Sequence, residues 1–389
     1  MIVKCKVLSP VFIGCGDEYT PLDYFIENGK VYIVDFNKVL DNINDIKKIN
    51  EITDYIKQNI HNNRIEVNAK DILSRLKLCP TDDNYVSKSL DCEIKNDSKT
   101  RVKKFISQNG VPYIPGSSIK GAIRTAYLFY YYDKHFTKLL KILNLNNHKS
   151  DSKKRHVNVN DIEKKLIKYA ISDNAQNDFF KYLKISDSLN LNGTFKFINT
   201  QRWYIKKRHG NPFGVKEDVE ALVDGNFDID IKIEDEFINE ISKKLKLKTS
   251  YNIRNETDKF EILKDICNSF AECIVEFELK RNYPIYIEDF YEKLLKDIKN
   301  NNAIYLNLGF GGGFFSKTIY PLLWKHDKEN KKFDEIKELF IKMAGNNEKL
   351  IKAWQSAEEY TDFPTTKTVY VKNESAELPM GWIKIEREV

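Results

Sequence analysis

The chain has 389 residues, of which 41% are apolar, and this length is enough for two or three folded domains. No apolar run approaches the ~20 residues that cross a bilayer, and the N-terminus lacks a secretion-signal layout, so we expect a soluble cytoplasmic protein without membrane contact. The net charge of +6 is weak support for nucleic-acid binding. The six cysteines show no C-x-x-C spacing, which favours reduced thiols over a zinc site.

The N-terminal half predicts strands and helices in alternation. Residues 1–8 alternate apolar and polar positions, as a strand does. Asn28-Gly29 predicts the turn of a hairpin over 24–35. The remaining expectations for this half are helices over 36–78, 117–145 and 160–183, a mobile loop over 80–104, a poorly ordered basic connection over 146–158, and paired strands over 183–204.

The C-terminal half repeats the same mixture. We expect strands at 226–233, 303–308, 367–371 and 382–385, and helices at 235–247, 255–282, 288–300 and from about 317 to 360. Gly210 to Gly214 would interrupt any regular element, so a domain boundary is expected there. The periodicities predict an α+β fold with two domains, 1–205 and 206–389.

The most informative segment runs from Val111 to Arg124. Pro112 and Pro115 hold the chain extended, and Gly116 permits a turn or a close approach. Ser117 or Ser118 is expected to cap a helix that carries Lys120 and Arg124 on one face. A helix N-terminus with two basic side chains suits a phosphate group. The alternative is an ordinary loop-to-helix junction with a solvated basic face.

A second feature is the glycine loop, residues 309–313, which is expected between a strand and a helix. Its glycines, Gly309, Gly311, Gly312 and Gly313, let N–H groups converge on an anion, and Lys317 would be a phosphate partner. The spacing from Gly311 to Thr318 also comes close to a P-loop, with Ser316 in place of the second glycine. A purely structural tight turn is the third possibility.

Basic and acidic residues are segregated along the chain. Residues 149–155 and 202–208 are basic, whereas 217–236 are rich in Asp and Glu. In the second basic run, Arg202 could hold a phosphate while Trp203 and Tyr204 stack on bases. The alternative places Trp203 in the core, with the basic residues at a solvated strand end.

The segment Ile114 to Arg124 resembles the "PGSS-hydrophobic-K-G-x-hydrophobic-R" signature of the RAMP superfamily, the RRM-like RNA-binding subunits of CRISPR effector complexes. Three other segments, Leu8–Gly16, Leu308–Gly313 and Leu378–Ile383, resemble the subunit at the guide-RNA 3′ end of type III-A (Csm) complexes. The resemblance implies two ferredoxin-like (RRM-like) domains with helical insertions: an N-terminal domain, 1–205, and a C-terminal domain, 206–389, that carries the glycine loop.

The function that this resemblance implies is a non-catalytic capping subunit without a cofactor. It would hold the 3′ region of the guide (crRNA), contact target RNA, stack on the backbone RAMP subunit among the other Csm subunits, and support guide maturation by a recruited host nuclease. A hairpin would wedge between guide and target, with 80–104 as its candidate. The expected RNA-binding residues are Gly14, Gly16, Gly116, Ser117, Ser118, Lys120, Arg124, Arg202, Gly309, Gly311, Gly312, Gly313 and Lys317.

Two enzymatic alternatives remain open. In related backbone subunits an aspartate after the first glycine loop cleaves target RNA with a divalent metal, and Asp23 falls at the corresponding place. One carboxylate holds a metal only if phosphates and water supply the other ligands, so Asp23 is a candidate catalytic residue that a turn role also explains. The second alternative is a nucleotide-binding ATPase built on residues 311–318.

Overall fold

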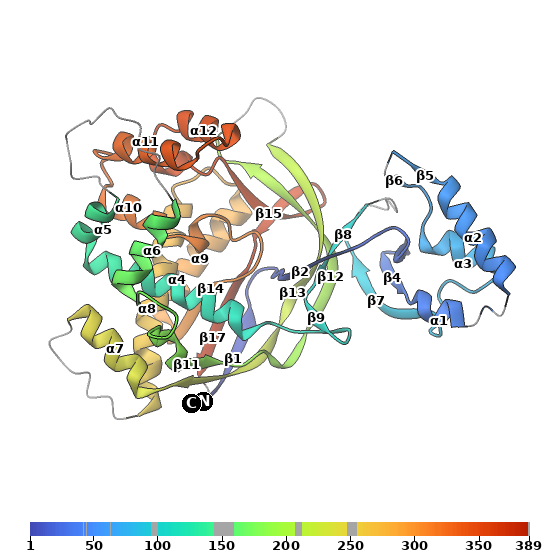
Figure 1. Cartoon of the computed structure of the whole chain (residues 1–389), viewed down its shortest axis with the longest axis horizontal. Helices are drawn as coiled ribbons and strands as arrows, with labels where there is room; N and C mark the ends of the chain where they lie inside the picture. Colours follow the sequence, from blue (N-terminus) through green and yellow to red (C-terminus); the bar gives the residue numbers. More distant parts are fainter. Residues whose placement is uncertain are drawn as a thin grey trace.

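We describe a computed structural model that covers residues 1–387, except 42, 44, 63, 95–99, 144–158, 207–211 and 247–254. A large β-sheet forms the middle of the molecule, helices cover one side of it, and a small helical lobe extends from its far end (Figure 1). The expected α+β class is therefore confirmed. The basic connection at 146–158 lies outside the described residues. No helix of the described parts is long and apolar enough to cross a membrane.

The centre of the sheet combines strands from both ends of the chain. Its order is β14-β17-β1-β13-β12, and each neighbouring pair is antiparallel. Strand β1 alternates exposed and buried residues, with Val3, Cys5 and Val7 in the core, so the periodicity that predicted this strand is the one that packs it. The bounds are β1 Ile2–Val7, β12 Leu189–Tyr204, β13 Phe213–Ile233, β14 Ala303–Asn307 and β17 Trp382–Arg387.

Strands β12 and β13 form a long antiparallel hairpin with three register shifts. The predicted boundary at residues 205–206 falls between these strands, so both predicted domains contribute to one hairpin. The expectation that 183–204 folds as strands paired with each other is wrong. Instead, β11 (Leu183–Ile185) and β12 both pair with β13, because β13 is long enough, at 21 residues, to serve both.

The sheet continues into a segment inserted between β1 and the first long helix. Strands β3 (Tyr24–Glu27) and β4 (Lys30–Val34) form the predicted hairpin, in which Asn28 and Gly29 have φ values of 50° and 74°, as a tight hairpin turn requires. Strand β2 (Gly14–Tyr19) pairs with β8 (Val102–Phe105).

The predicted loop over 80–104 is wrong for two stretches, 86–92 and 102–104, which form strands. Strand β7 (Val86–Cys92) pairs with β4 on one side and β12 on the other, and β8 pairs with β2 and β13. Alternate residues of β7 are only half-buried, so the hydrophobic pattern is weak and backbone pairing with two neighbours fixes the strand. Residues 95–99 of this prediction lie outside the described parts.

The helical prediction for 36–78 is confirmed in a lobe with its own small core (Figure 1). Phe25, Val34, Val39, Ala69 and Leu73 form that core. The lobe contains α1 (Phe36–Asp41), α2 (Ile46–Gln58), α3 (Ala69–Arg75) and the two-residue strands β5 (Ile60–His61) and β6 (Arg64–Ile65).

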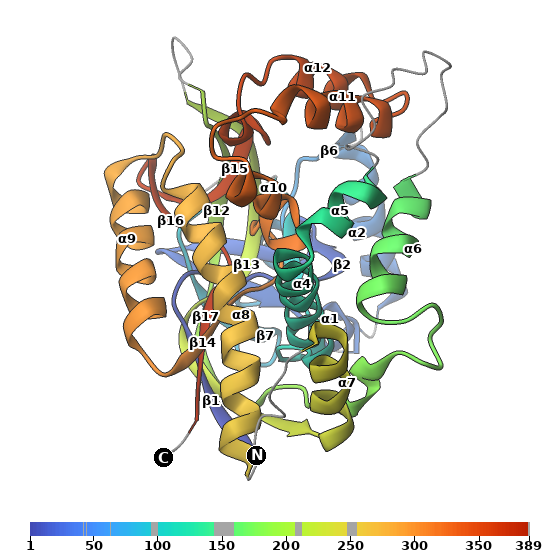
Figure 2. The same ribbon diagram turned by 90° about the vertical axis from the view of Figure 1, so that its left-hand side faces the viewer.

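Helices from both halves of the chain cover the sheet (Figure 2), and α8 packs against α4, α9 and β14. The helix expected over 117–145 breaks at His135, and the helix expected over 160–183 ends at Ala170. The helices are α4 Gly116–Lys134, α5 Phe136–Ile142, α6 Val159–Ala170, α7 Asp235–Leu245, α8 Glu256–Glu278, α9 Ile285–Asn300, α10 Tyr320–His326, α11 Phe333–Met343 and α12 Glu348–Gln355, with 3-10 helices η1 Phe179–Tyr182, η2 Phe315–Lys317 and η3 Tyr360–Asp362.

Two hairpins complete the chain. Strands β15 (Thr366–Lys372) and β16 (Ser375–Pro379) pair with each other, and β15 also pairs with β12. The sequence predicted β15 but not β16. The short strands β9 (Ser107–Gln108) and β10 (Val111–Pro112) form a separate hairpin outside the main sheet. This second hairpin lies just before α4, so the segment from Val111 to Arg124 begins within it.

Candidate nucleic-acid interface

The three segments Leu8–Gly16, Leu308–Gly313 and Leu378–Ile383 meet in the structure. The loop after β1, the glycine loop after β14 and the turn before β17 join through backbone hydrogen bonds. These bonds run from Phe310 N to the Phe12 carbonyl at 2.8 Å, from Leu308 N to the Gly381 carbonyl at 2.7 Å, from Gly381 N to the Pro10 carbonyl at 2.8 Å, and from Leu8 N to the Trp382 carbonyl at 2.9 Å. The glycine loop is therefore held from two sides.

Close packing accounts for two of the glycines. A Cβ on Gly309 would lie 2.2 Å from the Phe12 carbonyl oxygen, and its φ of +68° is unfavourable for other residues. A Cβ on Gly312 would lie 1.8 Å from Asn307 Oδ1 and 2.4 Å from Ser316 Oγ. These contacts show that part of the glycine pattern serves the tight turn itself.

The glycine loop presents its last residue to solvent. Gly313 is exposed, as is Lys317 in η2, whereas Gly311 and Gly312 are buried. Among the hydrogen bonds of the described residues, none is donated by the backbone N–H of Gly313. Burial of part of its side chain lowers the pKa of Lys317. An anion approaching the loop would therefore meet one N–H group and one amine.

The local geometry differs from that of a P-loop. A P-loop lysine lies at the start of an α-helix, but here Lys317 ends a 3-10 turn and α10 begins only at Tyr320. The hydroxyl of Thr318, which would contact a metal ion in a P-loop, donates to the Phe314 carbonyl at 2.9 Å. The helix expected from about Lys317 thus begins three residues later.

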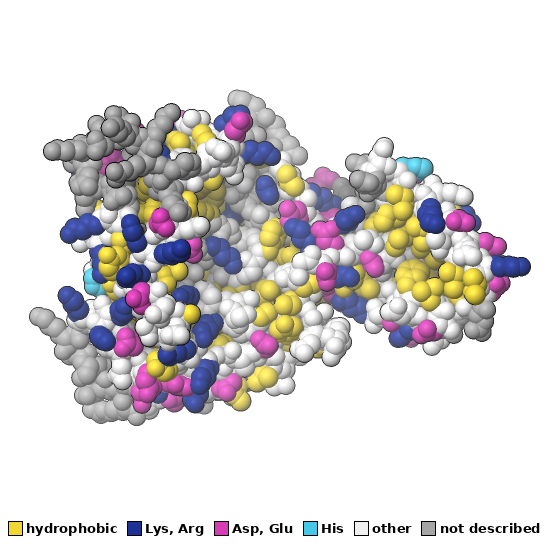
Figure 3. All heavy atoms as spheres, viewed as in Figure 1, with side chains coloured by type: hydrophobic (Ala, Val, Ile, Leu, Met, Phe, Trp, Pro, Cys, Tyr) yellow, Lys and Arg dark blue, Asp and Glu magenta, His cyan; other side chains and the backbone are white. Residues whose placement is uncertain are grey.

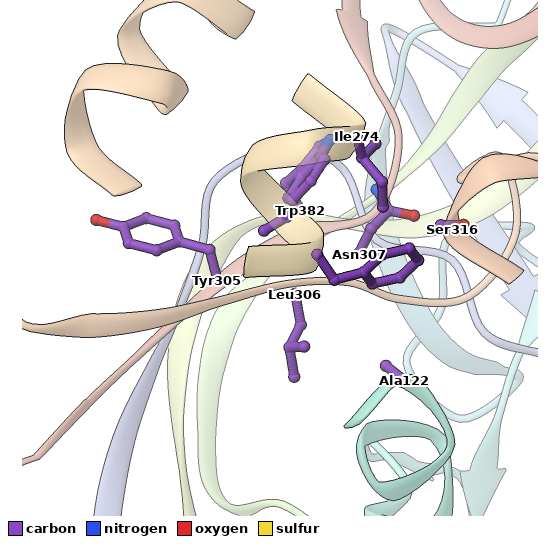
Figure 4. Close-up of a pocket in the computed structure, with 9 residues that line it drawn as sticks. Ala122, Ile274, Tyr305, Leu306, Asn307, Ser316 and Trp382 are labelled. Carbon is purple, nitrogen blue, oxygen red and sulfur yellow. The ribbon is translucent and has the colours of Figure 1, made fainter. Parts of the chain in front are cut away.

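Helix α4 and the glycine loop lie against each other although they are far apart in the sequence. The 3-10 helix η2 packs on α4. Ala122 of α4 lines a small closed gap together with Asn307, Ser316 and Trp382 (Figure 4). The gap has a volume of about 10 Å³, comparable to the space for one water molecule, so it is a packing gap and not a ligand pocket.

The expected serine cap of α4 is wrong. The helix begins at Gly116 after Pro115, and neither Ser117 nor Ser118 caps it. Instead, Asp187 accepts a hydrogen bond from the Gly116 N–H at 2.8 Å. A Cβ on Gly116 would lie 2.3 Å from the Ile185 carbonyl oxygen, so glycine is required for this close approach to β11. A carboxylate of the same chain thus occupies part of the predicted anion site.

The two basic residues of the signature face away from the glycine loop. With ~100° per residue, Arg124 lies about 200° around α4 from Ala122. Arg124 Nη1 donates to Asp178 Oδ2 at 2.7 Å, and its guanidinium lies 5.1 Å from the centre of the Phe180 ring. Lys120 makes no hydrogen bond or ion pair among the described contacts, and burial lowers its pKa. The structure therefore separates the predicted site into two parts.

The strand partner of Arg202 packs near the glycine loop. Arg202 is exposed and pairs with Thr368 of β15, and paired residues point to the same face of a sheet. The methyl carbon of Thr368 lies 3.7 Å from where a Cβ on Gly311 would be. The basic residues 207 and 208 of the same run lie outside the described parts.

The aromatic residue next to Arg202 has a structural role. The indole Nε1 of Trp203 donates to the Asn282 carbonyl at 3.0 Å, and its ring packs edge-on against Phe213. Trp203 is half-buried and packs against the main core, so part of its ring is committed to the fold.

The structure places the remaining predicted glycines on β2. Gly14 begins this strand directly after the segment that contacts the glycine loop, and Gly16 has a φ of +97° where the register with β8 shifts. Gly14 thus lies near the glycine loop, whereas Gly16 allows an irregularity in an exposed strand.

Asp23 lies in the turn between β2 and β3. Its Oδ2 accepts hydrogen bonds from the backbone N–H of Thr20 at 2.6 Å and from the Thr20 hydroxyl at 2.7 Å. Within the described parts of the chain, no group of three or more His, Cys, Asp and Glu residues is arranged to hold a metal ion. Asp23 therefore stabilises a turn, one of the two roles expected for it.

Sequence reasoning missed a buried ion network under the glycine loop. Lys367 Nζ donates to Glu278 Oε1 at 2.7 Å and to the Gly312 carbonyl at 2.7 Å, and Arg281 Nη1 donates to Glu278 Oε2 at 3.1 Å. Burial alone would raise the pKa of Glu278, but Lys367 and Arg281 hold it below its ordinary value. The one signal in the sequence is that Glu278 and Arg281 lie three residues apart at the end of an apolar helix.

Comparison with known proteins identifies relatives of the chain. Residues 4–316 match the family model of the RAMP superfamily. The chain is 54% identical over 385 residues to the CRISPR system Cms protein Csm5 of Methanocaldococcus jannaschii, and the match covers 99% of this chain and 88% of the relative. It is 23% identical over 329 residues to Csm5 of Mycobacterium tuberculosis, which covers 81% of each chain.

Solved structures share the fold. One chain of a cryo-EM structure of a Csm-crRNA-target RNA ternary complex from a type III-A CRISPR-Cas system matches with a TM-score of 0.66 at 22% identity, over 99% of this chain and all of that one. The crystal structure of T. onnurineus Csm5 matches with a TM-score of 0.60 at 21% identity, over 98% and 99% of the two chains.

Proposed function

This chain belongs to the RAMP superfamily and, within it, to the Csm5 proteins of CRISPR systems, and from this premise we propose that it caps a type III-A effector complex as a non-catalytic RNA-binding subunit. It stacks on the backbone RAMP subunit, holds the 3′ region of the guide RNA and contacts target RNA in the cytoplasm. A protein with the same fold is part of a Csm complex with crRNA and target RNA, which supports these partners.

The observation that carries the proposal is the convergence of the signature helix and the glycine loop. The glycine loop, η2 and α4 lie together, with Gly313, Lys317 and Arg202 exposed around them. Phosphate groups are the natural ligands of such N–H, amine and guanidinium donors, so affinity for RNA depends steeply on salt. Lys120 and Arg124, on the other side of α4, form a second contact.

The contribution of each residue follows from its position. Gly313, Lys317, Arg202 and Lys120 are open to direct contact, whereas Gly309, Gly311, Gly312 and Gly116 shape the backbone near the RNA. Ser117, Ser118, Gly14 and Gly16 lie at the edges of these segments and contribute contacts to the RNA backbone. Lys317 contacts a phosphodiester group of the RNA and not the phosphates of a nucleotide, as a P-loop lysine would.

The β9–β10 hairpin is a better candidate than 80–104 for the wedge between guide and target. Two stretches of 80–104 lie inside the sheet, as β7 and β8. The β9–β10 hairpin stands outside the main sheet, turns at Asn109 and Gly110 with positive φ, and leaves Val111 67% exposed. An exposed apolar side chain at the end of a protruding hairpin is suited to separate stacked bases.

We also propose that the chain contains two ferredoxin-like domains. The order β1, α4, β12, β13, α8, β17 is a β-α-β-β-α-β succession, and its strands lie in the sheet as β17-β1-β13-β12. This supports one ferredoxin-like unit, which takes its last helix and its last two strands from the C-terminal half. A second unit would use β15, β16 and the helices around the glycine loop.

Purified complexes test the proposed function. The other Csm subunits and a CRISPR array are co-expressed with and without this chain, and the bound RNA is sequenced. We expect repeat-derived guides in both preparations, with uniform 3′ ends only when the chain is present, because it covers that end and supports its maturation by a recruited nuclease. Identical 3′ ends in the two preparations, or failure of the chain to co-purify with the complex, would contradict the proposal.

A further inference from the structure

Three charged side chains lie buried together beneath the glycine loop. The side chains of Glu278 and Arg281 are 0% exposed and that of Lys367 is 4% exposed. They come from the end of α8, the turn after it and the start of β15. A buried ion network is often no more stable than an apolar cluster of the same volume, so its presence here calls for a reason other than stability.

Lys367 connects this network to the glycine loop. Its Nζ donates to the Gly312 carbonyl and to Glu278, both at 2.7 Å. In a trans peptide the C=O and the following N–H point in opposite directions. Because Lys367 draws the Gly312 carbonyl inward, the N–H of Gly313 is turned outward, toward the side where Gly313 is exposed.

The network also carries an excess positive charge. Lys367 and Arg281 share a single carboxylate, Glu278, and Arg281 also donates to the carbonyls of Thr361 and Pro364 and to the Tyr283 hydroxyl. Lys367 Nζ lies 3.7 Å from the position that a Cβ on Gly313 would occupy. A glycine at the surface thus leaves a buried ammonium group within a short distance of any ligand of the loop, where the protein interior screens charge weakly.

We propose that Lys367 is a positioning residue that presets the glycine loop for a phosphodiester group of RNA. It fixes the peptide between Gly312 and Gly313 so that the N–H of Gly313 faces the ligand, and its own hydrogen bond to the Gly312 carbonyl is sufficient for this. This inference rests on the proposed function, since it assumes that the glycine loop contacts guide RNA.

Two variants separate positioning from stability. Lys367→Met and Glu278→Gln both break the Lys367–Glu278 ion pair, but only Lys367→Met also removes the donor to the Gly312 carbonyl. We expect Lys367→Met to bind a fluorescent repeat-derived guide RNA roughly tenfold more weakly than the unchanged full-length chain, whereas Glu278→Gln binds within about twofold of it. Thermal unfolding of both variants measures the structural effect that they share.

Hydrogen exchange of the backbone supplies a readout independent of affinity. In Lys367→Met, amides of residues 309–314 exchange faster than in Glu278→Gln, while the rest of the chain is alike in the two variants. In the unchanged chain, adding guide RNA protects the same peptide. The measurement on the unchanged chain tests the inference even if Lys367→Met does not fold. If guide RNA does not slow the exchange of residues 309–314, the inference is overturned.

The outcomes distinguish the inference from the function on which it rests. Equal losses of affinity in Lys367→Met and Glu278→Gln overturn the positioning role and leave a structural one. Normal affinity of Lys367→Met together with weakened binding by Lys317→Ala also overturns it, but keeps the glycine loop as an RNA contact. Normal affinity of all three variants, or no guide binding by the unchanged chain, overturns the proposed function.

Discussion

Arg124 and Asp178 form an ion pair in which Nη1 and Oδ2 lie 2.7 Å apart, and their side chains are 29% and 22% exposed. The pair joins α4 to the segment before η1, and the Phe180 ring lies beside the guanidinium. The arginine of the signature is thus anchored within the fold before any RNA arrives. Its remaining donors are oriented by this anchor, which costs less conformational entropy than ordering a free side chain on binding.

The Arg124–Asp178 pair allows RNA binding and stability to be separated. Arg124→Ala should reduce the slope of log affinity against log salt for guide RNA by about 1, because one phosphate contact is lost. Asp178→Ala breaks the same pair but leaves the positive charge, so its slope should stay unchanged or rise. Filter binding at several salt concentrations measures both slopes. Equal slopes for the two variants would show that the pair serves the fold alone.

A matched pair of glycine substitutions tests the packing of the glycine loop. Gly312→Ala places a methyl group 1.8 Å from Asn307 Oδ1, so the loop must move; we expect loss of guide binding and about 1–3 kcal/mol of stability. Gly121→Ala is the control, because Gly121 is an exposed α4 residue whose Cβ would meet nothing within 4 Å. It should gain up to about 1 kcal/mol. Chemical denaturation measures both, and equal effects would contradict the close packing at Gly312.

The buried ion network predicts a loss of stability in acid. The pKa of Glu278 is lower in the folded chain than its ordinary value of 4.5, so its contribution is fully present above the unfolded pKa and is lost as pH falls through the folded one. The difference in unfolding free energy between the unchanged chain and Glu278→Gln should therefore be constant above about pH 5 and shrink below about pH 4. Denaturation at constant ionic strength measures it; a difference independent of pH down to pH 2 would rule out a lowered pKa of Glu278 in the folded chain.

Asp23 provides a test of catalysis against turn formation. Asp23→Ala removes the acceptor of two hydrogen bonds from Thr20 and should cost about 1–2 kcal/mol. Cleavage of target RNA by the complex in the presence of Mg²⁺ should not change. Asp23→Asn keeps a side-chain acceptor and is the conservative control for the turn. Loss of cleavage in both variants, with stability retained in Asp23→Asn, would establish the metal-dependent nuclease instead.

Local signals determined how much of the fold could be predicted. Helices α7, α8 and α9 follow the sequence closely, because α7 and α9 each bury one apolar stripe, while α8 is long, buried on several sides and begins at a helix-capping Asn255. The hydrophobic alternation of β7 was too weak to predict a strand. The strand is fixed by backbone pairing with β4 and β12, and this pairing cannot be seen in the local sequence. The sequence predicts only parts of the β12–β13 hairpin as strands, because bulges interrupt the alternation of apolar and polar residues along it.

The candidate site was predictable only where chemistry lies in short motifs. The glycine loop and the α4 segment are visible in the sequence because glycine and proline restrict the backbone locally. The roles of Asp187, Asp178 and Lys367 are not, because each acts on a residue far away in the chain. Asp187 caps α4 from 71 residues further along the chain, so no local sequence motif indicates its role.

The position of β1 in the sheet also bears on how this protein is made. Val3 pairs with Ile229 on one side and Arg387 on the other. At a synthesis rate of about 5–20 residues per second, β1 waits roughly 20–80 s after its own synthesis for its neighbour β17. During that time its open edge and the apolar side chains of Val3 and Val7 must be shielded by chaperones or by transient contacts. A nascent chain that stalls late in translation is therefore a prime target for quality control.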